Sequence, residues 1–328
     1  MILLALLACA RDCESRAPAA GKDAECRIAG WSGRNAIVHL PSGWTGGPVP
    51  VILGFHGGGG RKEGVNPTSC LDGDEDDPSC LTAVADAAGF AVVYPDGTPK
   101  LLGRVRSWNA GGGQDGWRCV GGTGCDEGVD DVAYVADVLD TVGELFPIDA
   151  TRVFATGISN GAAMSHRLAC DMPERIAGIA PIAGENQAQG WPGCPAAHPV
   201  PILQIHGTED PCWEYDGTIG PCLTDEPVEE RFVSVDESMT GWAERLGCTG
   251  GPVEGETLDA VDDGTSVTRF DWEGCAAPLG LLRIDGGGHT WPGGWDYLRE
   301  ERIGRVSKEL VGSEVVVDFF RGLPTTGG

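Results

Sequence analysis

The sequence lacks any long apolar run: no stretch approaches the roughly 20 residues that a membrane-spanning helix needs. It is also poor in positive charge, with 23 lysines and arginines against 49 aspartates and glutamates in 328 residues, a formal net charge of −26. A charge of this size repels phosphate backbones and anionic membranes. We therefore expect a protein with no membrane span and no nucleic-acid partner.

Metal-ligand spacing is also missing from the cysteines. No C-x-x-C pair occurs, and the 13 cysteines are not grouped with histidines as they are in zinc sites. A metal site stays open as an alternative, but this spacing favours disulfides. If Cys9 is set aside, the others form neighbouring couples in sequence order, which would suit an oxidising compartment: Cys13–Cys26, Cys70–Cys80, Cys119–Cys125, Cys170–Cys194, Cys212–Cys222 and Cys248–Cys275.

The N-terminus, MILLALLACARDC, is a short apolar stretch that ends in small residues, which is typical of a signal sequence. Leu6-Leu7-Ala8-Cys9 resembles a bacterial lipobox, in which the cysteine is lipidated. No lysine or arginine precedes the apolar run, so export without a lipid and a cytosolic location remain alternatives. We expect a secreted protein or a bacterial cell-surface lipoprotein anchored at Cys9.

The acidic segment LDGDEDDPSC alternates aspartates as calcium-binding loops do. However, Asp77 stands where such a loop needs its turn glycine, and Ala83 stands where it needs its last glutamate. The spacing therefore favours a solvated loop closed by a Cys70–Cys80 disulfide over a calcium site.

Strand-like apolar runs alternate with amphipathic helical segments along the chain. The expected strands are 50–55, 90–95, 152–157, 176–184, 200–207 and 281–285, and the expected helices are 81–89, 130–146, 162–170, 234–247 and 312–322. This alternation predicts an α/β fold with a mostly parallel sheet covered by helices on both faces. No repeat or linker divides the chain, so we expect a leader and short linker over 1–27 and a single catalytic domain over 28–328.

The segment TGISNGA places Ser159 between Gly157 and Gly161, after an apolar strand and before a helical stretch. A strand that turns sharply into a helix forces its apex residue into strained backbone angles, and side chains two positions away on either side would clash. Glycines remove the clash, and the helix N-terminus supplies free N–H groups. The pattern predicts a nucleophile elbow with Ser159 at its apex.

An acyl-transfer serine also needs a histidine base and a carboxylate that orients it. In elbow hydrolases the chain order is Ser, then Asp or Glu, then His. Asp210 lies just past the strand PILQIHG, with Glu209 as its nearest competitor, and His289 lies on a glycine-rich loop after the last strand. Order and context predict a catalytic triad of Ser159, Asp210 and His289.

The segment FHGGGG follows the strand PVILG and matches the loop that lends an N–H to the oxyanion. We predict that the N–H groups of Asn160 and Gly58 are the two donors, with Gly57 as an alternative to Gly58. His56 and His206 each follow a strand and precede a glycine turn, and we expect them to brace their loops by hydrogen bonds.

The motifs FHGGGG, VVYPDG, SWN followed by VDDVAYV, TGISNGAAMSHRLAC, IAPIAG, PILQIHGTEDP, GGGHTWPGG and VVVDFF extend in this order over roughly residues 45–320. Together they resemble the secreted polyhydroxybutyrate depolymerase and feruloyl esterase family (carbohydrate esterase family 1-like). The resemblance implies a serine carboxylesterase of the α/β-hydrolase fold with no metal or other cofactor. It implies that Ser159 is the nucleophile, Asp210 the orienting acid and His289 the base, and that Cys170–Cys194 and Cys248–Cys275 are bridges.

The sequence departs from this family at two places: Gly58 stands where many relatives have a cysteine, and AGGGQDGWRCVGGTGC lengthens the segment after Trp-Asn. Trp108 and Trp291 flank loops that would face the site, so we predict that they bind substrate, with covering of the core as an equal alternative. The expected substrates are polymer-derived esters: feruloyl or acetyl esters of polysaccharides, or polyhydroxyalkanoate, which the sequence does not rank. A peptidase and a catalytically silent binding protein are the alternative classes.

Overall fold

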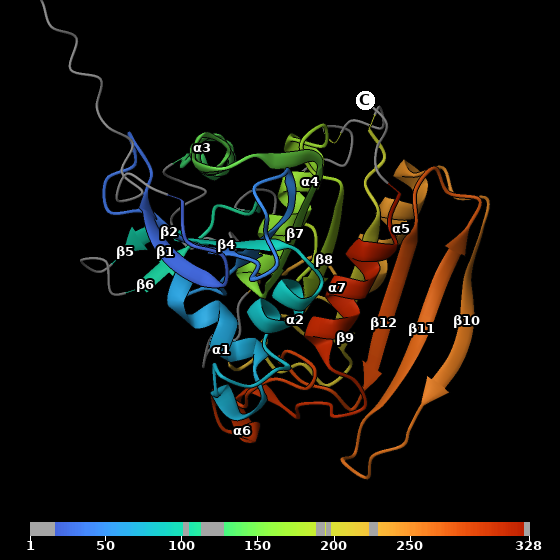
Figure 1. Cartoon of the computed structure of the whole chain (residues 1–328). Coiled ribbons are helices and arrows are strands. Elements are labelled where there is room, and N and C mark those ends of the chain that lie inside the picture. The colour runs from blue at the N-terminus through green and yellow to red at the C-terminus, as the bar shows by residue number, and fades with distance from the viewer. Residues whose placement is uncertain are drawn as a thin grey trace, which may run out of the picture.

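The computed structural model describes residues 17–100, 105–112, 128–187, 194, 198–222 and 229–324. A ten-stranded sheet with the order β1-β2-β4-β3-β7-β8-β9-β12-β11-β10 runs through the centre of the molecule (Figure 1). The six adjacent strands from β4 to β12 are parallel, and the two strands at each end of the sheet are added antiparallel. The predicted mostly parallel sheet is thus confirmed.

The strands of the main sheet are β1 (Lys22–Arg27), β2 (Asn35–Leu40), β3 (Val49–Phe55), β4 (Ala91–Pro95), β7 (Ile148–Ile158), β8 (Gly178–Ile182), β9 (Ile202–Gly207), β10 (Gly250–Leu258), β11 (Ser266–Glu273) and β12 (Leu279–Asp285). A small second sheet pairs β5 (Thr98–Lys100) with β6 (Val105–Ser107). The helices are α1 (Val65–Ser69), α2 (Leu81–Ala87), α3 (Asp131–Leu145), α4 (Asn160–Asp171), α5 (Val235–Arg245), α6 (Glu300–Ile303) and α7 (Gly312–Gly322). No described helix has the length and apolar character that a bilayer crossing requires.

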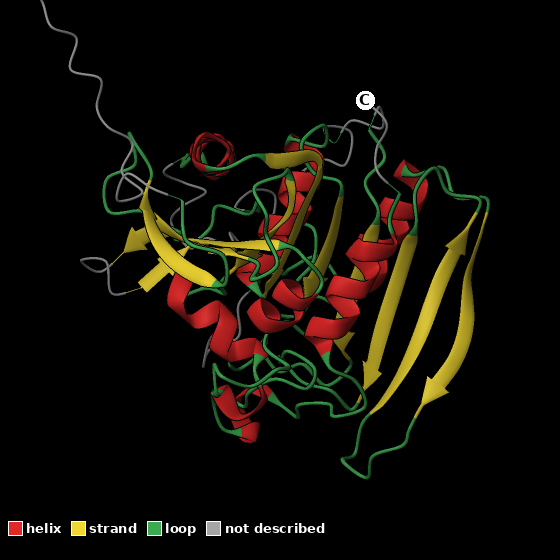
Figure 2. Ribbon diagram, in the orientation of Figure 1, coloured by secondary structure: helices red, strands yellow, loops and turns green. Residues whose placement is uncertain are grey.

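Helices cover both faces of the sheet, as predicted (Figure 2). On one face, α3, α4 and α5 bury side chains such as Val138, Met164 and Trp242 in one core cluster. On the other face, α2 and α7 bury Leu81 and Phe320 in a second cluster. Each parallel strand therefore packs on both sides, which is why these strands read as nearly continuous apolar runs in the sequence.

All the strands and helices that the sequence predicts are present, with ends shifted by a few residues. The sequence analysis missed the antiparallel strands at the two ends of the sheet. β10 is exposed along almost its whole length, so it shows no apolar alternation that would reveal a strand. β1 corrects the predicted domain boundary, because residues 22–27 pair with β2 and belong to the sheet rather than to a linker.

Four of the predicted disulfides are present: Cys70–Cys80, Cys170–Cys194, Cys212–Cys222 and Cys248–Cys275. The predicted Cys119–Cys125 pair, Cys13 and the leader with Cys9 lie outside the described residues. Four bridges in one chain are typical of proteins that work in an extracellular, oxidising compartment.

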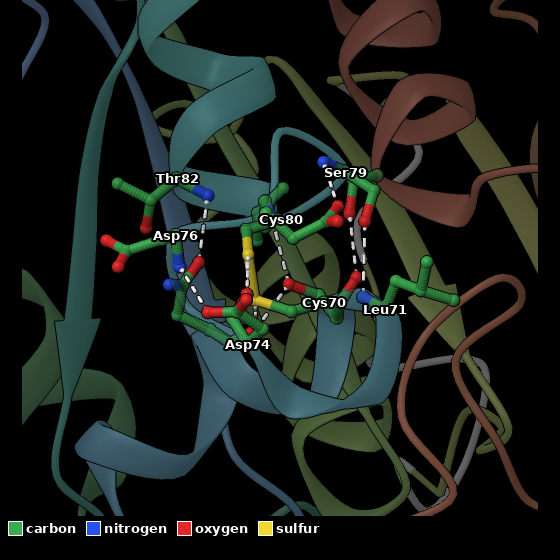
Figure 3. Close-up of a disulfide and its surroundings, with 12 residues drawn as sticks. Cys70, Leu71, Asp74, Asp76, Ser79, Cys80 and Thr82 are labelled. Carbon is green, nitrogen blue, oxygen red and sulfur yellow. Dashed lines mark hydrogen bonds between the residues drawn. A yellow bond between two sulfur atoms is a disulfide. The ribbon is translucent and has the colours of Figure 1, made fainter.

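Figure 3 shows the acidic loop that the Cys70–Cys80 bridge closes. The Asp74 carboxylate accepts a hydrogen bond from the Asp76 N–H at 3.1 Å, and the Ser79 hydroxyl oxygen accepts one from the Leu71 N–H at 3.2 Å. Short polar side chains thus tie this loop to its own backbone, as they do in Asx turns. The predicted disulfide-closed loop is confirmed.

Candidate active site

The turn from β7 into α4 places Ser159 at the carboxyl edge of the sheet. Ser159 has φ 60° and ψ −123°, a backbone conformation that is strained for a residue with a side chain. A Cβ on Gly157 would lie 2.5 Å from the Phe55 carbonyl oxygen, and a Cβ on Gly161 would overlap the same atom more closely. Glycine is therefore required at both flanks because the end of β3 approaches the turn.

Asp210 and His289 lie in contact at the carboxyl ends of two neighbouring strands, because Asp210 follows β9 and His289 follows β12. Asp210 Oδ2 lies 2.7 Å from His289 Nδ1, and both side chains are buried. Asp210 Oδ1 accepts hydrogen bonds from the N–H groups of Cys212 at 2.7 Å and Trp213 at 2.9 Å, so both carboxylate oxygens are held. A histidine that donates through Nδ1 keeps the lone pair on Nε2, where it can accept a proton.

Glu209, the competing carboxylate, takes no part in this arrangement. Its carboxylate pairs with Arg305 at 3.2 Å, and its side chain is 64% exposed. Asp210 is thus buried against His289, whereas its neighbour Glu209 forms an ion pair at the surface.

Ser159 and His289 line one cavity of about 390 Å³ together with Gly57 and Gly58. Asp210 does not reach the cavity but lies behind His289. The apolar part of the wall comes from Val65, Ile158, Tyr297, Leu298, Ile303 and the Cys212–Cys222 disulfide. A larger cavity of about 710 Å³ lies between α5 and the β10–β12 strands, but it contains none of the predicted site residues.

The predicted oxyanion donors lie next to each other beside the serine. A Cβ on Gly58 would lie 3.7 Å from the Asn160 Cβ, and a Cβ on Gly57 would lie 3.4 Å from the Ser159 Cβ. Asn160 is the first residue of α4, where backbone N–H groups have no partner within the helix. Two N–H donors from different segments can therefore point to one oxygen at this place.

The Asn160 side chain has a function that the sequence analysis missed. Its Oδ1 accepts a hydrogen bond from the Trp108 N–H at 2.7 Å, and its Nδ2 donates to the Trp108 carbonyl at 2.9 Å. This pair of bonds fixes the segment after β6 against the start of α4. The sequence shows only an asparagine directly after the elbow serine, which does not reveal that its side chain binds Trp108.

His56 braces the oxyanion loop, as predicted. Its Nε2 accepts a hydrogen bond from the Gly97 N–H at 2.9 Å, and its Nδ1 donates to the Gly57 carbonyl at 2.8 Å. Burial lowers the pKa of His56 to about 4, so the ring is neutral and keeps this donor and acceptor pattern at neutral pH. The prediction that His56 holds its loop is confirmed.

The structure corrects the prediction that Trp108 and Trp291 bind substrate. Both side chains are 0% exposed, and neither lines the cavity. Trp108 packs edge-on against Phe55 at 5.1 Å between ring centroids and donates its Nε1–H to the His56 carbonyl at 3.0 Å. The two tryptophans cover the core on opposite faces of the sheet, which was the alternative interpretation.

The side chains of Asp210, Cys212 and His289 have metal-ligating atoms within 4.8 Å of one another. However, the Cys212 sulfur is bonded to Cys222, and the Asp210 and His289 side chains are hydrogen-bonded to each other. A disulfide sulfur is not a thiolate ligand. This group therefore does not form a metal site.

Comparisons with known proteins identify the family of the chain. Residues 131–218, which include Ser159 and Asp210, match the family model described as Phospholipase/Carboxylesterase. The protein named "Putative esterase NocK", from Nocardia uniformis subsp. tsuyamanensis, is 30% identical over 83% of this chain and 74% of its own length. Feruloyl esterase B of Piromyces equi is 26% identical over 81% of this chain and 45% of its own length. The solved structure of native pOPH has the same fold, with a TM-score of 0.51 and 16% identity over 85% of this chain and 84% of that one.

The chain belongs to the feruloyl esterase and acetylxylan esterase family, carbohydrate esterase family 1-like, within the α/β hydrolases. It is a carboxylic ester hydrolase, and the predicted fold class and enzyme class are confirmed.

Proposed function

We propose that this protein is a secreted serine esterase that hydrolyses feruloyl esters of polysaccharide fragments through Ser159, His289 and Asp210. The observation that carries the proposal is the 2.7 Å contact of Asp210 Oδ2 with His289 Nδ1 at a cavity that Ser159 also lines. The catalytic domain then comprises the whole sheet and its helices, with no cofactor in the reaction.

In this mechanism, His289 Nε2 takes the proton of the Ser159 hydroxyl while the serine oxygen attacks the ester carbonyl. The N–H groups of Asn160 and Gly58 donate to the oxyanion of the tetrahedral intermediate. His289 then gives the proton to the leaving alcohol, and water hydrolyses the acyl-enzyme by the same route in reverse. Asp210 keeps the His289 proton on Nδ1 and stabilises the imidazolium that forms.

The walls of the cavity support an aromatic acyl group. Val65, Ile158 and Leu298 are apolar, and the volume of about 390 Å³ lies within the roughly 300–1,000 Å³ range of small-molecule pockets. An acetyl group would leave most of this apolar wall uncovered, whereas a planar feruloyl group would cover more of it. The name of the Piromyces equi relative points to the same acyl group.

The test compares Ser159→Ala with wild type on p-nitrophenyl acetate, methyl ferulate and a hydroxybutyrate trimer. Ser165→Ala is the matched control, because Ser165 lies in α4 and donates only to the Gly161 carbonyl at 3.0 Å. We expect Ser159→Ala to be inactive, Ser165→Ala to be active, and the wild-type kcat/KM to be highest on methyl ferulate. Activity in Ser159→Ala contradicts the mechanism, and faster turnover of the trimer contradicts the substrate.

A further inference from the structure

Glu185 and His206 form a buried pair beside the site. Glu185 follows β8 and His206 lies in β9. Asp210 follows β9 and His289 follows β12, the next strand in the sheet, so the two pairs lie side by side. Glu185 Oε1 lies 3.0 Å from His206 Nδ1, and both side chains are 0% exposed. An ionisable pair without contact to water is costly to bury unless its hydrogen bonds are satisfied.

The second ring nitrogen of His206 identifies where its proton lies. His206 Nε2 is 2.9 Å from the Trp213 carbonyl oxygen and 3.5 Å from Asp210 Oδ2. A carbonyl oxygen can only accept, so Nε2 carries a hydrogen. The remaining proton of the pair lies between Nδ1 and Glu185, on either atom, and Nε2–H is present in both cases.

The pKa shifts have the same sense at both members of the pair. Burial raises the pKa of the Glu185 carboxyl and outweighs the hydrogen bond with His206. Burial alone would lower the pKa of His206, but the hydrogen bond with Glu185 and the charge of Asp210 outweigh it and raise that pKa. Both shifts keep the shared proton on the pair as the pH rises.

The Trp213 peptide connects this pair to the site. Its N–H donates to Asp210 Oδ1, and its carbonyl accepts from His206 Nε2. His206 is therefore linked to Asp210 in two ways: by hydrogen bonds through this peptide to Oδ1, and by the 3.5 Å distance between Nε2 and Oδ2.

We propose that His206 is a positioning residue for the esterase reaction: Glu185 fixes its protonation so that Nε2–H holds the Trp213 peptide, whose N–H orients the Asp210 carboxylate toward His289. This inference rests on the proposed triad. It assigns Glu185 and His206 a role in catalysis that acts only through Asp210, since neither residue lines the cavity.

Other polar groups also face the pair. The Tyr215 ring lies perpendicular to His206 at 6.0 Å between centroids, and burial raises the pKa of Tyr215, so its hydroxyl stays neutral. From α5, Ser238 lowers the pKa of the Glu185 carboxyl, whereas the charge of Asp236 raises that pKa. On the Nε2 side of His206 lies Asp210, and His289 lies beyond Asp210.

The test uses two amide substitutions of His206, each of which replaces one of the two ring nitrogens. In His206→Gln the amide nitrogen can take the place of Nε2, whereas in His206→Asn the amide reaches only the place of Nδ1. We expect His206→Asn to lower kcat by about 10- to 100-fold through misplacement of the Asp210–His289 unit, with KM within about twofold of wild type. His206→Gln should restore most of kcat.

The pH profile of kcat/KM distinguishes positioning from space filling, because a residue that only fills space would leave its inflection unchanged. The acid limb of kcat/KM reports the base of the free enzyme, here His289. The positive end of the His206 N–H opposes protonation of His289, so its removal should move this inflection to higher pH, by roughly 0.5 unit. Glu185→Gln should move it in the same direction by less, because an amide cannot share a proton with Nδ1, which leaves Nε2–H less strongly polarised but in place.

His166→Asn is the matched control. His166 is also buried, with Gln204 at 3.0 Å from Nε2 and the Trp242 indole N–H donating to Nδ1 at 3.1 Å, but neither partner is a site residue. We expect this variant to lose stability without a shift in the pH profile. Thermal unfolding of each variant and titration of Ser159 with a phosphonate inhibitor give kcat per folded site.

Equal kcat and equal inflection in His206→Asn and wild type would overturn the proposal, as would an equal shift in His166→Asn. If His206→Asn does not fold, Glu185→Gln decides: an unmoved inflection overturns the proposal, and a shift to higher pH supports it. Ser159→Ala separates this result from the proposed function, because an active Ser159→Ala overturns the triad itself. An inactive Ser159→Ala with an unmoved His206→Asn overturns only the role of His206.

Discussion

Replacing Asp210 by asparagine changes one atom at the centre of the site. Asp210 Oδ1 accepts from two backbone N–H groups, at 2.7 Å and 2.9 Å, and an amide nitrogen in that place would face two donors. The asparagine oxygen therefore keeps the Oδ1 place, and its NH₂ group takes the Oδ2 place at 2.7 Å from His289 Nδ1. His289 must then accept at Nδ1 and carry its proton on Nε2.

The consequence for catalysis follows from this tautomer. With a hydrogen on Nε2, His289 cannot take the Ser159 proton, and no carboxylate stabilises an imidazolium. A change of this kind lowers kcat by about 10⁴-fold, which corresponds to about 5 kcal/mol of transition-state stabilisation at about 1.36 kcal/mol per decade. The change is isosteric, so we expect the variant to fold and to bind substrate with a similar KM.

The assay is steady-state hydrolysis of p-nitrophenyl acetate, with thermal unfolding as the check on folding. Glu209→Gln is the control, since Glu209 pairs with Arg305 on the surface, and it should keep kcat within about twofold. Asp210→Asn with kcat within tenfold of wild type would refute the reasoning. So would a loss in Glu209→Gln as large as that in Asp210→Asn, because the orienting carboxylate would then be the wrong one.

Three further predictions concern stability and the walls of the site. Gly161→Ala brings a Cβ onto a β3 carbonyl and should lower the free energy of unfolding in urea by about 3 kcal/mol, the upper end for overpacking, whereas Gly43→Ala, where nothing lies within 4 Å, should change little. Removing the Cys212–Cys222 bridge by a double serine substitution should cost about 2–3 kcal/mol in the same assay and lower kcat, because the Cys212 N–H holds Asp210; unchanged kcat would contradict the second part. Burial lowers the pKa of His39, but hydrogen bonds with two aspartates outweigh it and raise that pKa, so His39 stabilises the fold fully below its ordinary pKa of about 6.5 and this contribution is lost as the pH rises through the raised value. The difference in unfolding free energy between wild type and His39→Gln should therefore shrink from about pH 5 to about pH 9, and a constant difference would contradict it.

The fold was predictable where local pattern and tertiary environment agree. Strands such as β4 and β8 are buried at every residue, so their sequences are continuous apolar runs. Helix α3 begins at an aspartate cap and buries one face, which is the periodicity that the sequence shows. β10 was missed because it pairs at the edge of the sheet while almost all its side chains face solvent.

The site was predictable only in part. Ser159 and His289 could be selected from motif order and glycine context, and they line one cavity. Trp108 and Trp291 were misassigned because proximity to a loop in sequence says nothing about which way a large ring points; both rings fill the core. Glu185 gave no signal at all, since a single glutamate after a strand resembles any surface residue until its partner is known.

By itself, the sequence determined the six parallel strands, the helices between them, the elbow at Ser159 and four local disulfide pairs, because each depends on residues close together along the chain. Only the tertiary structure decided that Asp210 rather than Glu209 contacts His289, that two tryptophans are buried, and that Glu185 and His206 stand behind Asp210. These contacts join residues that are distant in sequence, such as Asp210 and His289, 79 positions apart, and the order of β8, β9 and β12 in the sheet brings them together. Strand order is the result of packing the whole chain, and no local pattern encodes it.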